Sequence, residues 1–340
     1  MTTSSAEAPR VSPDGAAEGV VLSGTGGIWR VLLSDGRTVE ATMRGRLKKD
    51  AERGPSRGRG ARSGEADAAY KLAVGDHVSV EAEPGPDGLV VFCITAIAPR
   101  RSKLARRAPG GAWGERVVVA NLDQVLVVFA AANPEPHPRM LDRFLVIAEA
   151  NDLLARIVVN KCDLADDPAV HARFADYERA GYAVHYTSVP RGAGLEALRA
   201  VVQGRVSALT GPSGVGKSSL MNALFPGLTL RVGAISESVN KGRHTTVGAS
   251  LHPLPGGGFV ADTPGLREVG LWGIDVRDVA ACFPEFRPWL DGCRFADCTH
   301  LVEPGCAIRQ AVEEREVSRS RWESYAKLRE ELASATAQGW

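Results

Sequence analysis

The spacing of hydrophobic residues changes character twice along the chain. From about residue 18 to residue 99, short runs rich in β-branched residues are separated by the turn signals Ser-Asp-Gly and Pro-Asp-Gly. Strand-length runs at this spacing are typical of a small all-β barrel. The Gly/Arg-rich segment 51–64 has little to bury, so we expect a flexible loop there.

A second pattern begins after residue 112. Apolar, strand-length runs alternate with helical patterns such as PRMLDRFLVIAEAND at 138–152, whose apolar residues share one face. Strands that alternate with helices predict a parallel sheet covered on both faces. We interpret residues 117–131 as one buried strand, and the later strand runs are ARIVVN, YAVHYTS, VSALTG and FVADTPG.

The pattern changes again near residue 273, where a Cys/His cluster precedes a charged segment, 310–332, that we interpret as one helix. The expected organisation is a disordered tail (1–17), a β-barrel domain (18–108), an α/β domain (109–272) and a mainly helical, metal-binding domain (273–340). The N-terminus lacks the charged-then-apolar pattern of a signal sequence, and no apolar run approaches the roughly 20 residues of a membrane span.

The net charge of +1 conceals two basic clusters in the 340 residues. Residues 42–63 carry eight Arg or Lys against two acids, and RRSKLARR at 100–107 carries five basic residues and no acid. Such clusters are often only solvated loops. Beside a β-barrel we favour contact with RNA, made mainly through phosphates and shape.

The segment GPSGVGKS at 211–218 fits the phosphate-loop pattern G-x-x-x-x-G-K-[ST]. Gly211, Gly214 and Gly216 let the backbone turn its N–H groups toward phosphate oxygens. Lys217 can reach the β and γ phosphates, and the Ser218 hydroxyl can bind Mg²⁺. A glycine-rich turn can match by chance, but this one lies between a strand run and a helical run, as the mechanism requires.

Two later segments fit the same chemistry. In ADTPG, 261–265, Asp262 would hold Mg²⁺ through water and the Gly265 N–H would sense the γ-phosphate. The motif alone is only a turn, but it ends a strand run about 45 residues after the phosphate loop. In NKGRHTTVG, 240–248, a threonine could complete the Mg²⁺ shell; an ordinary polar loop is the alternative.

The base-reading signal comes before the phosphate loop. Asn160-Lys161-Cys162-Asp163 follows the strand run RIVV, and Asp163 can accept hydrogen bonds from guanine N1–H and the 2-amino group. Adenine lacks that pair of donors, which would leave a buried carboxylate unpaired. We expect Asn160 to orient the loop, Lys161 to lie over the base, and the Ser188 N–H in Thr-Ser-Val to meet guanine O6.

Both nucleotide motifs can belong to one binding site if the domain is circularly permuted. A parallel sheet binds ligands at the carboxyl ends of its strands wherever the chain is opened. The order here is base loop, Thr-Ser-Val, phosphate loop, switch threonines and Asp-Thr-Pro-Gly. The switch segments therefore lead straight into the C-terminal region.

Four metal-ligating residues crowd into 293–306 in the spacing C-x₄-C-x-H-x₅-C: Cys293, Cys298, His300 and Cys306. Three thiolates and an imidazole form a closed, tetrahedral, structural zinc set, with no position open for catalysis. The other three cysteines of the six are interpreted as ordinary residues. A metal set without a disulfide scaffold indicates a reducing compartment, and we expect a cytoplasmic protein.

The permuted order, the barrel in front and the Cys/His cluster behind resemble the RsgA (YjeQ) family of ribosome-dependent GTPases, over residues 18–335. The resemblance implies an OB-fold domain, a permuted GTPase domain and a zinc-bearing domain. It also implies a monomer that binds GTP or GDP with Mg²⁺, acts on the small ribosomal subunit and its rRNA late in assembly, and hydrolyses GTP there. The resemblance carries over Asn160, Lys161 and Asp163 as guanine contacts, Gly214, Gly216, Lys217, Ser218 and Ser219 as phosphate and Mg²⁺ contacts, and Thr246 as the switch threonine. The full set of expected nucleotide contacts adds Ser188, Gly211, Ser213, Val215, Asp262 and Gly265, and Ser218 and Thr246 are expected on Mg²⁺.

The chain has no water-orienting glutamine just after D-x-x-G, where many GTPases have one, because Leu266 occupies that position. The resemblance implies His244 as a catalytic residue, along with Lys217 and Thr246; a solvated loop histidine is the alternative. The family usually has three threonines after that histidine, and this chain has Thr245, Thr246 and Val247.

Two other functions fit the same motifs. One is a permuted GTPase that acts on another RNA particle, such as the large ribosomal subunit. The other is an RNA-binding protein that nucleotide switches with negligible turnover.

Overall fold

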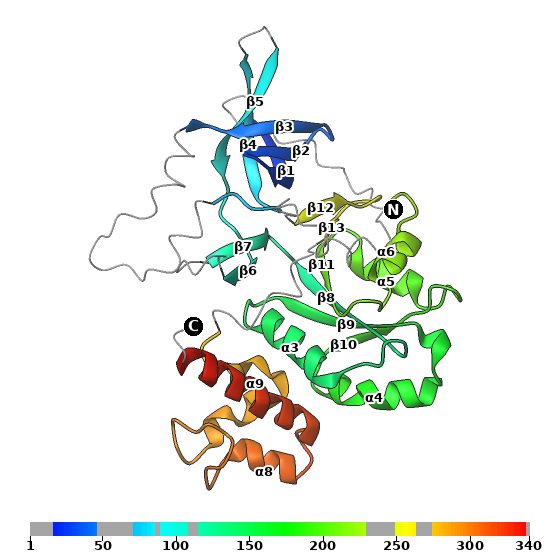
Figure 1. Cartoon of the computed structure of the whole chain (residues 1–340), viewed down its shortest axis with the longest axis vertical. Helices are drawn as coiled ribbons and strands as arrows, with labels where there is room; N and C mark the ends of the chain where they lie inside the picture. The colour runs from blue at the N-terminus through cyan, green and yellow to red at the C-terminus, as the bar shows by residue number, and fades with distance from the viewer. Residues whose placement is uncertain are drawn as a thin grey trace, which may run out of the picture. The chain divides into compact units, whose positions relative to one another are not determined.

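The structure is a computed structural model that describes residues 16–45, 71–85, 89–107, 115–228, 249–262 and 274–337 (Figure 1). The chain forms two compact units, which are described separately. The first contains the described residues up to Leu122, with the short segments 249–252 and 261–262, and the second contains the rest. Within the described residues, no helix combines the length and the apolar character needed to cross a membrane.

The first unit is built on a closed five-stranded barrel (Figure 1). Its strands, in their order around the barrel, are β1 (Ala17–Thr25), β2 (Ile28–Leu33), β3 (Thr38–Met43), β5 (Val90–Ile97) and β4 (His77–Pro84). Alternate residues point inward and form one apolar core that includes Val21, Val31, Val80 and Ile94. The predicted N-terminal barrel is confirmed.

A short two-stranded sheet follows the barrel. β6 (Lys103–Arg107) pairs antiparallel with β7 (Glu115–Ala120). The interpretation of 117–131 as one strand was wrong, because the chain leaves β7 at Asn121, whose φ is +58°. The Asn121 side chain donates to Gly75 O and accepts from the Arg101 N–H, and these bonds fix the bend.

The basic cluster at 100–107 is partly structural. Arg100 forms an ion pair with Asp76, with Nε 2.7 Å from Oδ1, and the Asp76 side chain is fully buried. A second nitrogen of Arg100 donates to Asp76 Oδ2 at 2.8 Å, so the pair is bidentate. Arg100 therefore connects the segment after β5 to the turn before β4. Because Asp76 occupies its guanidinium group, we do not propose Arg100 as an RNA contact.

The second unit contains most of a six-stranded sheet in the order β10-β9-β8-β11-β13-β12. The strands are β8 (Gln124–Ala130), β9 (Leu154–Asn160), β10 (Ala183–Tyr186), β11 (Val206–Thr210), β12 (Ser250–Pro253) and β13 (Phe259–Asp262). β8 pairs in parallel with both β9 and β11, and β10 pairs in parallel with β9. The predicted parallel α/β sheet is confirmed.

The alternation of residues in β8 explains how both faces of the sheet are covered. Leu126 and Val128 belong to a core shared with α5 (Leu195–Val202) and α6 (Lys217–Leu224). Phe129 points the other way and meets Phe144 of α3 (Pro138–Glu149) edge-on, with ring centroids 6.4 Å apart. A strand buried on both faces has no polar side, which explains its continuous apolar sequence. α4 (Asp167–Arg179) contributes the crossover between β9 and β10.

The C-terminal region is helical and irregular. It contains the 3₁₀ helices η3 (Val279–Cys282) and η4 (Pro284–Gly292), then α8 (Ala307–Glu313) and α9 (Arg319–Ala337). The interpretation of 310–332 as one helix was wrong. The chain turns at Arg315, where φ is +65°, and the N–H groups of Glu316 and Val317 both donate to Ala311 O. These bonds end α8 before α9 begins.

A buried arginine joins this region to the α/β core. Arg321 of α9 is 1% exposed, with Nη1 2.5 Å from Asp142 of α3 and Nε 2.6 Å from Glu285 of η4. Its guanidinium carbon also lies 4.6 Å from the ring centroid of Phe283. Burial alone lowers the pKa of Arg321, but the charges of Asp142 and Glu285 raise it above its ordinary value. The arginine therefore stays charged and clamps three elements together.

We expect Arg321→Ala to lower the free energy of unfolding by about 3–5 kcal/mol, because it leaves two buried carboxylates without their cation. The measurement is urea unfolding followed by tryptophan fluorescence. Arg143→Ala is the control, since it removes the half-exposed pair between Arg143 and Glu331 and should cost less than about 1 kcal/mol. Equal losses for the two variants would show that the buried clamp is not a main source of stability.

Candidate nucleotide site and metal centre

The candidate nucleotide motifs follow the carboxyl ends of neighbouring parallel strands. Asn160 ends β9, Thr187 and Ser188 follow β10, and Gly211 follows β11. β8 lies between β9 and β11, so the motifs gather at one edge of the sheet. In open α/β sheets ligands bind at this edge.

The phosphate loop, residues 211–218, is held in a tight turn against the strands beside it. Gly211 has φ +136°, and a Cβ there would lie 2.0 Å from Val128 O, so only glycine fits. Lys217 starts α6, and its ammonium donates to Gly211 O at 2.9 Å and Pro212 O at 2.7 Å. Ser218 is 7% exposed in the first turn of α6. Backbone N–H groups at the start of a helix suit an anion.

Asn160 connects the base-reading loop with the phosphate loop. Its Nδ2 donates to Val215 O at 2.9 Å, and its Oδ1 accepts from the Thr187 hydroxyl at 3.1 Å. The side chain is 2% exposed, and a Cβ on Gly216 would lie 2.6 Å from Nδ2. Donor and acceptor partners on the two sides set the orientation of the amide. Thr187 was not among the site residues predicted from the sequence, although its position directly after a strand run was a signal.

Two side chains of the base-reading loop are also fixed by neighbouring segments. Asp163 Oδ1 accepts from the Ser188 hydroxyl at 2.6 Å, and within the described residues Oδ2 has no hydrogen bond. Lys161 has a left-handed backbone, φ +60°, and its ammonium donates to Asn133 O at 2.5 Å. The loop therefore places the Asp163 carboxylate and the Lys161 side chain close together in the sequence, each held by a hydrogen bond to another segment.

Ser188 has partners for both of its polar groups. The N–H expected at guanine O6 donates to Ala193 O at 3.0 Å, and the hydroxyl donates to Asp163. The geometry gives Ser188 a second role that was not predicted from the sequence, namely positioning the Asp163 carboxylate. Its contact with O6 stays a prediction.

Three of the remaining predicted contacts lie within the described residues. Ser213 is exposed in the phosphate loop, Ser219 is half-buried in α6, and Asp262 is the last residue of β13. His244, Thr246 and Gly265 lie outside the described residues, as does most of the basic segment 42–63. Their assigned roles stay predictions.

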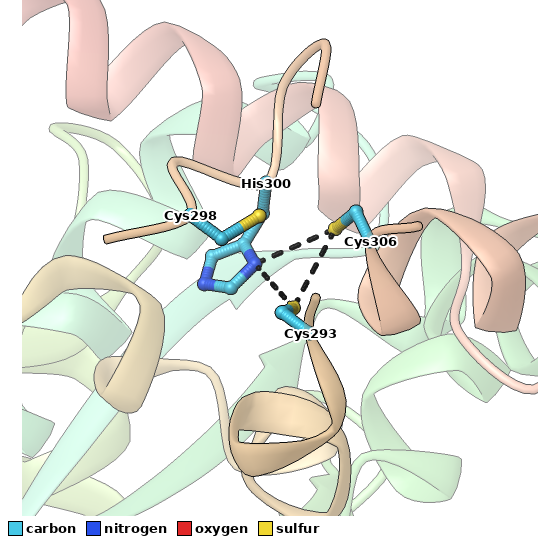
Figure 2. A group of neighbouring side chains, drawn as sticks. All are labelled: Cys293, Cys298, His300 and Cys306. Atoms are coloured by element: carbon cyan, nitrogen blue, oxygen red, sulfur yellow. Dashed lines mark hydrogen bonds between the residues drawn. The ribbon is translucent and has the colours of Figure 1, made fainter. Parts of the chain in front are cut away.

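The four predicted metal ligands converge on one point (Figure 2). His300 Nδ1 lies 3.4 Å from Cys293 Sγ and 3.5 Å from Cys306 Sγ, and those two sulfurs are 3.9 Å apart. A tetrahedral ion with sulfur at about 2.3 Å places its sulfurs about 3.8 Å apart. The cluster therefore has the dimensions of a closed four-ligand metal site, and Nδ1 is the imidazole atom nearest the sulfurs of Cys293 and Cys306.

Glu303 organises the loop between these ligands. Its carboxylate accepts hydrogen bonds from the hydroxyl and N–H of Thr299 and from the N–H groups of Leu301 and Val302. Burial opposes the charge, but these bonds lower the pKa of Glu303 to about 2. The ionised carboxylate holds the turn that carries His300, whose φ is +61°.

A bound cation would favour the protonation states in which these four residues can act as metal ligands. Burial lowers the pKa of His300, which favours the neutral imidazole that a metal needs. Burial also raises the pKa of Cys298 to about 12 and raises that of Cys306. A bound cation supplies the charge that allows such thiols to ionise.

Sequence comparisons identify similar proteins. The RsgA GTPase family profile matches residues 97–272. The small ribosomal subunit biogenesis GTPase RsgA of Gemmatimonas aurantiaca is 64% identical over 314 residues, which cover 92% of this chain and 97% of the relative. The protein of that name from Bacteroides fragilis is 35% identical over 317 residues, covering 92% and 96%.

Two solved structures are similar over nearly the whole chain. YjeQ from Thermotoga maritima matches with a TM-score of 0.73 and 31% identity, covering 94% of this chain and 99% of that one. YloQ, described as a circularly permuted GTPase, matches with a TM-score of 0.69 and 26% identity, covering 96% and 99%.

We expect Cys298→Ser to lose stoichiometric metal and to make residues 274–337 sensitive to proteolysis, because the loop then lacks one of its four ligands. Metal content is measured by mass spectrometry after dialysis, and cleavage sites are measured by limited trypsin digestion. Cys93→Ser, in the barrel, should keep its metal. Full metal content in Cys298→Ser would refute the four-ligand assignment.

We expect Ser188→Ala to weaken GDP binding by about 10-fold, because it removes the hydrogen bond that positions the Asp163 carboxylate. Titration with a fluorescent GDP analogue measures the dissociation constant. Ser34→Ala, in an exposed turn of the barrel, is the control and should bind like the wild type. Unchanged affinity in a folded Ser188→Ala protein would contradict the positioning role.

Proposed function

This chain belongs to the RsgA family of GTPases, and we propose that it hydrolyses GTP on the small ribosomal subunit and assists that subunit's late maturation. The relative from Gemmatimonas aurantiaca, named for this activity, is 64% identical over 92% of the chain. Relatives of this name from other bacteria support the same function. Binding to the small subunit and to GTP or GDP is the function that the site supports best.

The observation that carries the proposal is the hydrogen bond from Asn160 Nδ2 to Val215 O, at 2.9 Å. It joins the loop that would read guanine to the loop that would hold phosphates, in the permuted chain order. A chance match to either motif would not place the two loops in contact. One pocket can therefore take a base at Asp163 and a phosphate chain at Lys217.

Within this pocket we assign three groups of residues to GTP. Asn160, Lys161, Asp163 and Ser188 bind the base. The phosphate loop, with Gly211, Ser213, Gly214, Val215, Gly216, Lys217, Ser218 and Ser219, binds the phosphates. Mg²⁺, which neutralises phosphate charge when bound, would be held by Ser218 and Thr246 and, through water, by Asp262, while Gly265 senses the γ-phosphate.

We propose His244 as the group that orients the attacking water. Leu266 stands where many GTPases have a water-orienting glutamine, and an apolar side chain cannot orient water. A histidine in the segment GRHTT can accept a hydrogen bond from water near the γ-phosphate. Lys217 and Thr246 would stabilise the developing charge.

We propose that the metal of the C-terminal cluster is zinc. Three thiolates with one imidazole at tetrahedral spacing suit zinc, and four protein ligands leave no position open for a reacting water. The ion would stabilise the irregular loop that Glu303 and Cys298 share. Its role is then structural.

The three-domain organisation also belongs to the proposal. We assign residues 18–108 to an OB-fold RNA-binding domain, 109–272 to the permuted GTPase domain and 273–340 to the zinc-binding domain. The basic segment 42–63 would contact rRNA phosphates. We further propose that the protein acts in the cytoplasm as a monomer.

The test is GTP hydrolysis, measured as phosphate release, with and without purified ribosomal subunits. We expect small subunits to raise the rate well above the basal value, because rRNA contacts would order the segment that carries His244. Large subunits serve as the control and should leave the rate unchanged. Stimulation by large subunits alone, or no turnover with either subunit, would refute the proposal.

The same assay separates the assigned roles. His244→Ala should lower the stimulated rate by about 100-fold while GDP affinity stays near the wild-type value. Lys217→Ala should abolish turnover with any partner, since the phosphates lose their cation. His171→Ala, exposed on α4, is the matched histidine control and should hydrolyse GTP normally.

A further inference from the structure

A groove of about 810 Å³ lies at the edge of the sheet opposite to the nucleotide motifs. One wall is formed by the end of α3 and the starts of β9 and β10, and the other by η3 and η4. Its volume falls in the range of ligand-binding pockets. The nucleotide motifs follow the carboxyl ends of the strands, so the groove is a separate surface.

The groove is acidic. Glu149, Asp152 and Asp278 line it, and the only basic residue among the described residues that line it is Arg287. Arg287 is already used, with Nη2 2.6 Å from Glu149 and Nε donating to Ala281 O. Among the described residues, neither Asp152 nor Asp278 has an ion pair. Two carboxylates therefore face the groove without a cation.

A buried hydroxyl in the groove wall also lacks a partner. Tyr182, directly before β10, is 6% exposed, and its hydroxyl has no hydrogen-bond partner among the described residues. Buried polar groups in folded proteins are almost always hydrogen-bonded. A phenol oxygen beside carboxylates can accept a hydrogen bond from an ammonium or a guanidinium group.

The same wall offers apolar contact area. Leu154, the first residue of β9, lines the groove and is 48% exposed, although most leucines of the second unit are buried. Pro284 and Ala281 line the opposite wall. A ligand that fits this surface has both a cationic group and an apolar group, which a polypeptide supplies and a simple metal ion does not.

We propose that this groove docks a basic, extended peptide segment of a partner protein. A lysine or arginine of the segment pairs with Asp152 and Asp278 and donates to the Tyr182 hydroxyl, while a neighbouring apolar side chain packs on Leu154. RNA is a poor occupant, because its phosphates would face carboxylates. This surface is independent of the nucleotide pocket, and the inference does not rest on GTP hydrolysis.

The probe for the test is a fluorescein-labelled peptide, Gly-Lys-Leu-Gly-Lys-Leu-Gly-Lys-Gly, titrated with the full chain and followed by fluorescence anisotropy. We expect saturable binding that the double variant Asp152→Asn, Asp278→Asn weakens by about 10-fold or more. Tyr182→Phe should weaken it by a few-fold. The matched control is Glu313→Gln with Glu316→Gln, which removes the same charge from exposed positions outside the groove and should bind like the wild type.

A charge swap tests the site in the opposite direction. The double variant Asp152→Lys, Asp278→Lys should no longer bind the lysine peptide and should bind a peptide in which the three lysines are replaced by glutamates. Equal affinity of the groove double variant and the matched control overturns the proposal. So does equal binding of a probe whose leucines are serines, or full competition by spermidine at equal charge, since either would indicate a simple cation site.

Discussion

The structure depends on one buried amide at the junction of two loops. Asn160 donates to Val215 O and accepts from Thr187, so a single side chain fixes the distance between the candidate base-reading and phosphate-binding segments. Hydrogen bonds in the protein interior are strong, and a buried donor or acceptor that loses its partner carries the full free-energy cost of desolvation. The pocket is thus preorganised by hydrogen bonds that belong to the chain and not to a ligand.

The C-terminal region is also held in place by a few buried polar contacts. Arg321 holds α9 and η4 against α3, while the four candidate metal ligands converge within a loop that has no regular secondary structure. The two devices are connected, because Trp322 Nε1 donates to His300 O and the Tyr325 hydroxyl donates to Thr299 O. The first turns of α9 therefore contact both the α/β core and the loop of the candidate metal ligands.

The sequence predicted what depends on local order. Motifs at strand ends could be assembled into one site, because parallel strands bring their carboxyl ends to one edge whatever the chain order. The four metal ligands could be found because their spacing is short. Nucleotide-contact assignments beyond that geometry, such as His244 and Thr246, rest on resemblance and stay predictions.

What the sequence could not predict depends on partners far along the chain. Arg100 and Arg321 lie in charged segments that favour solvent or RNA, yet each forms an ion pair with a buried carboxylate supplied by a distant segment. The bend at Asn121 is fixed by Gly75, 46 residues away. No local pattern carries these pairings, since they form only when the fold brings the segments together.

The permuted order has a consequence for synthesis of the chain. Asn160 and Val215 are separated by 55 residues, and both halves of the pocket fall within the continuous stretch from β8 to α6. This stretch is translated before β12, β13 and the cysteine cluster. A nascent chain can therefore form the contact between Asn160 and Val215 while its last third is still being made.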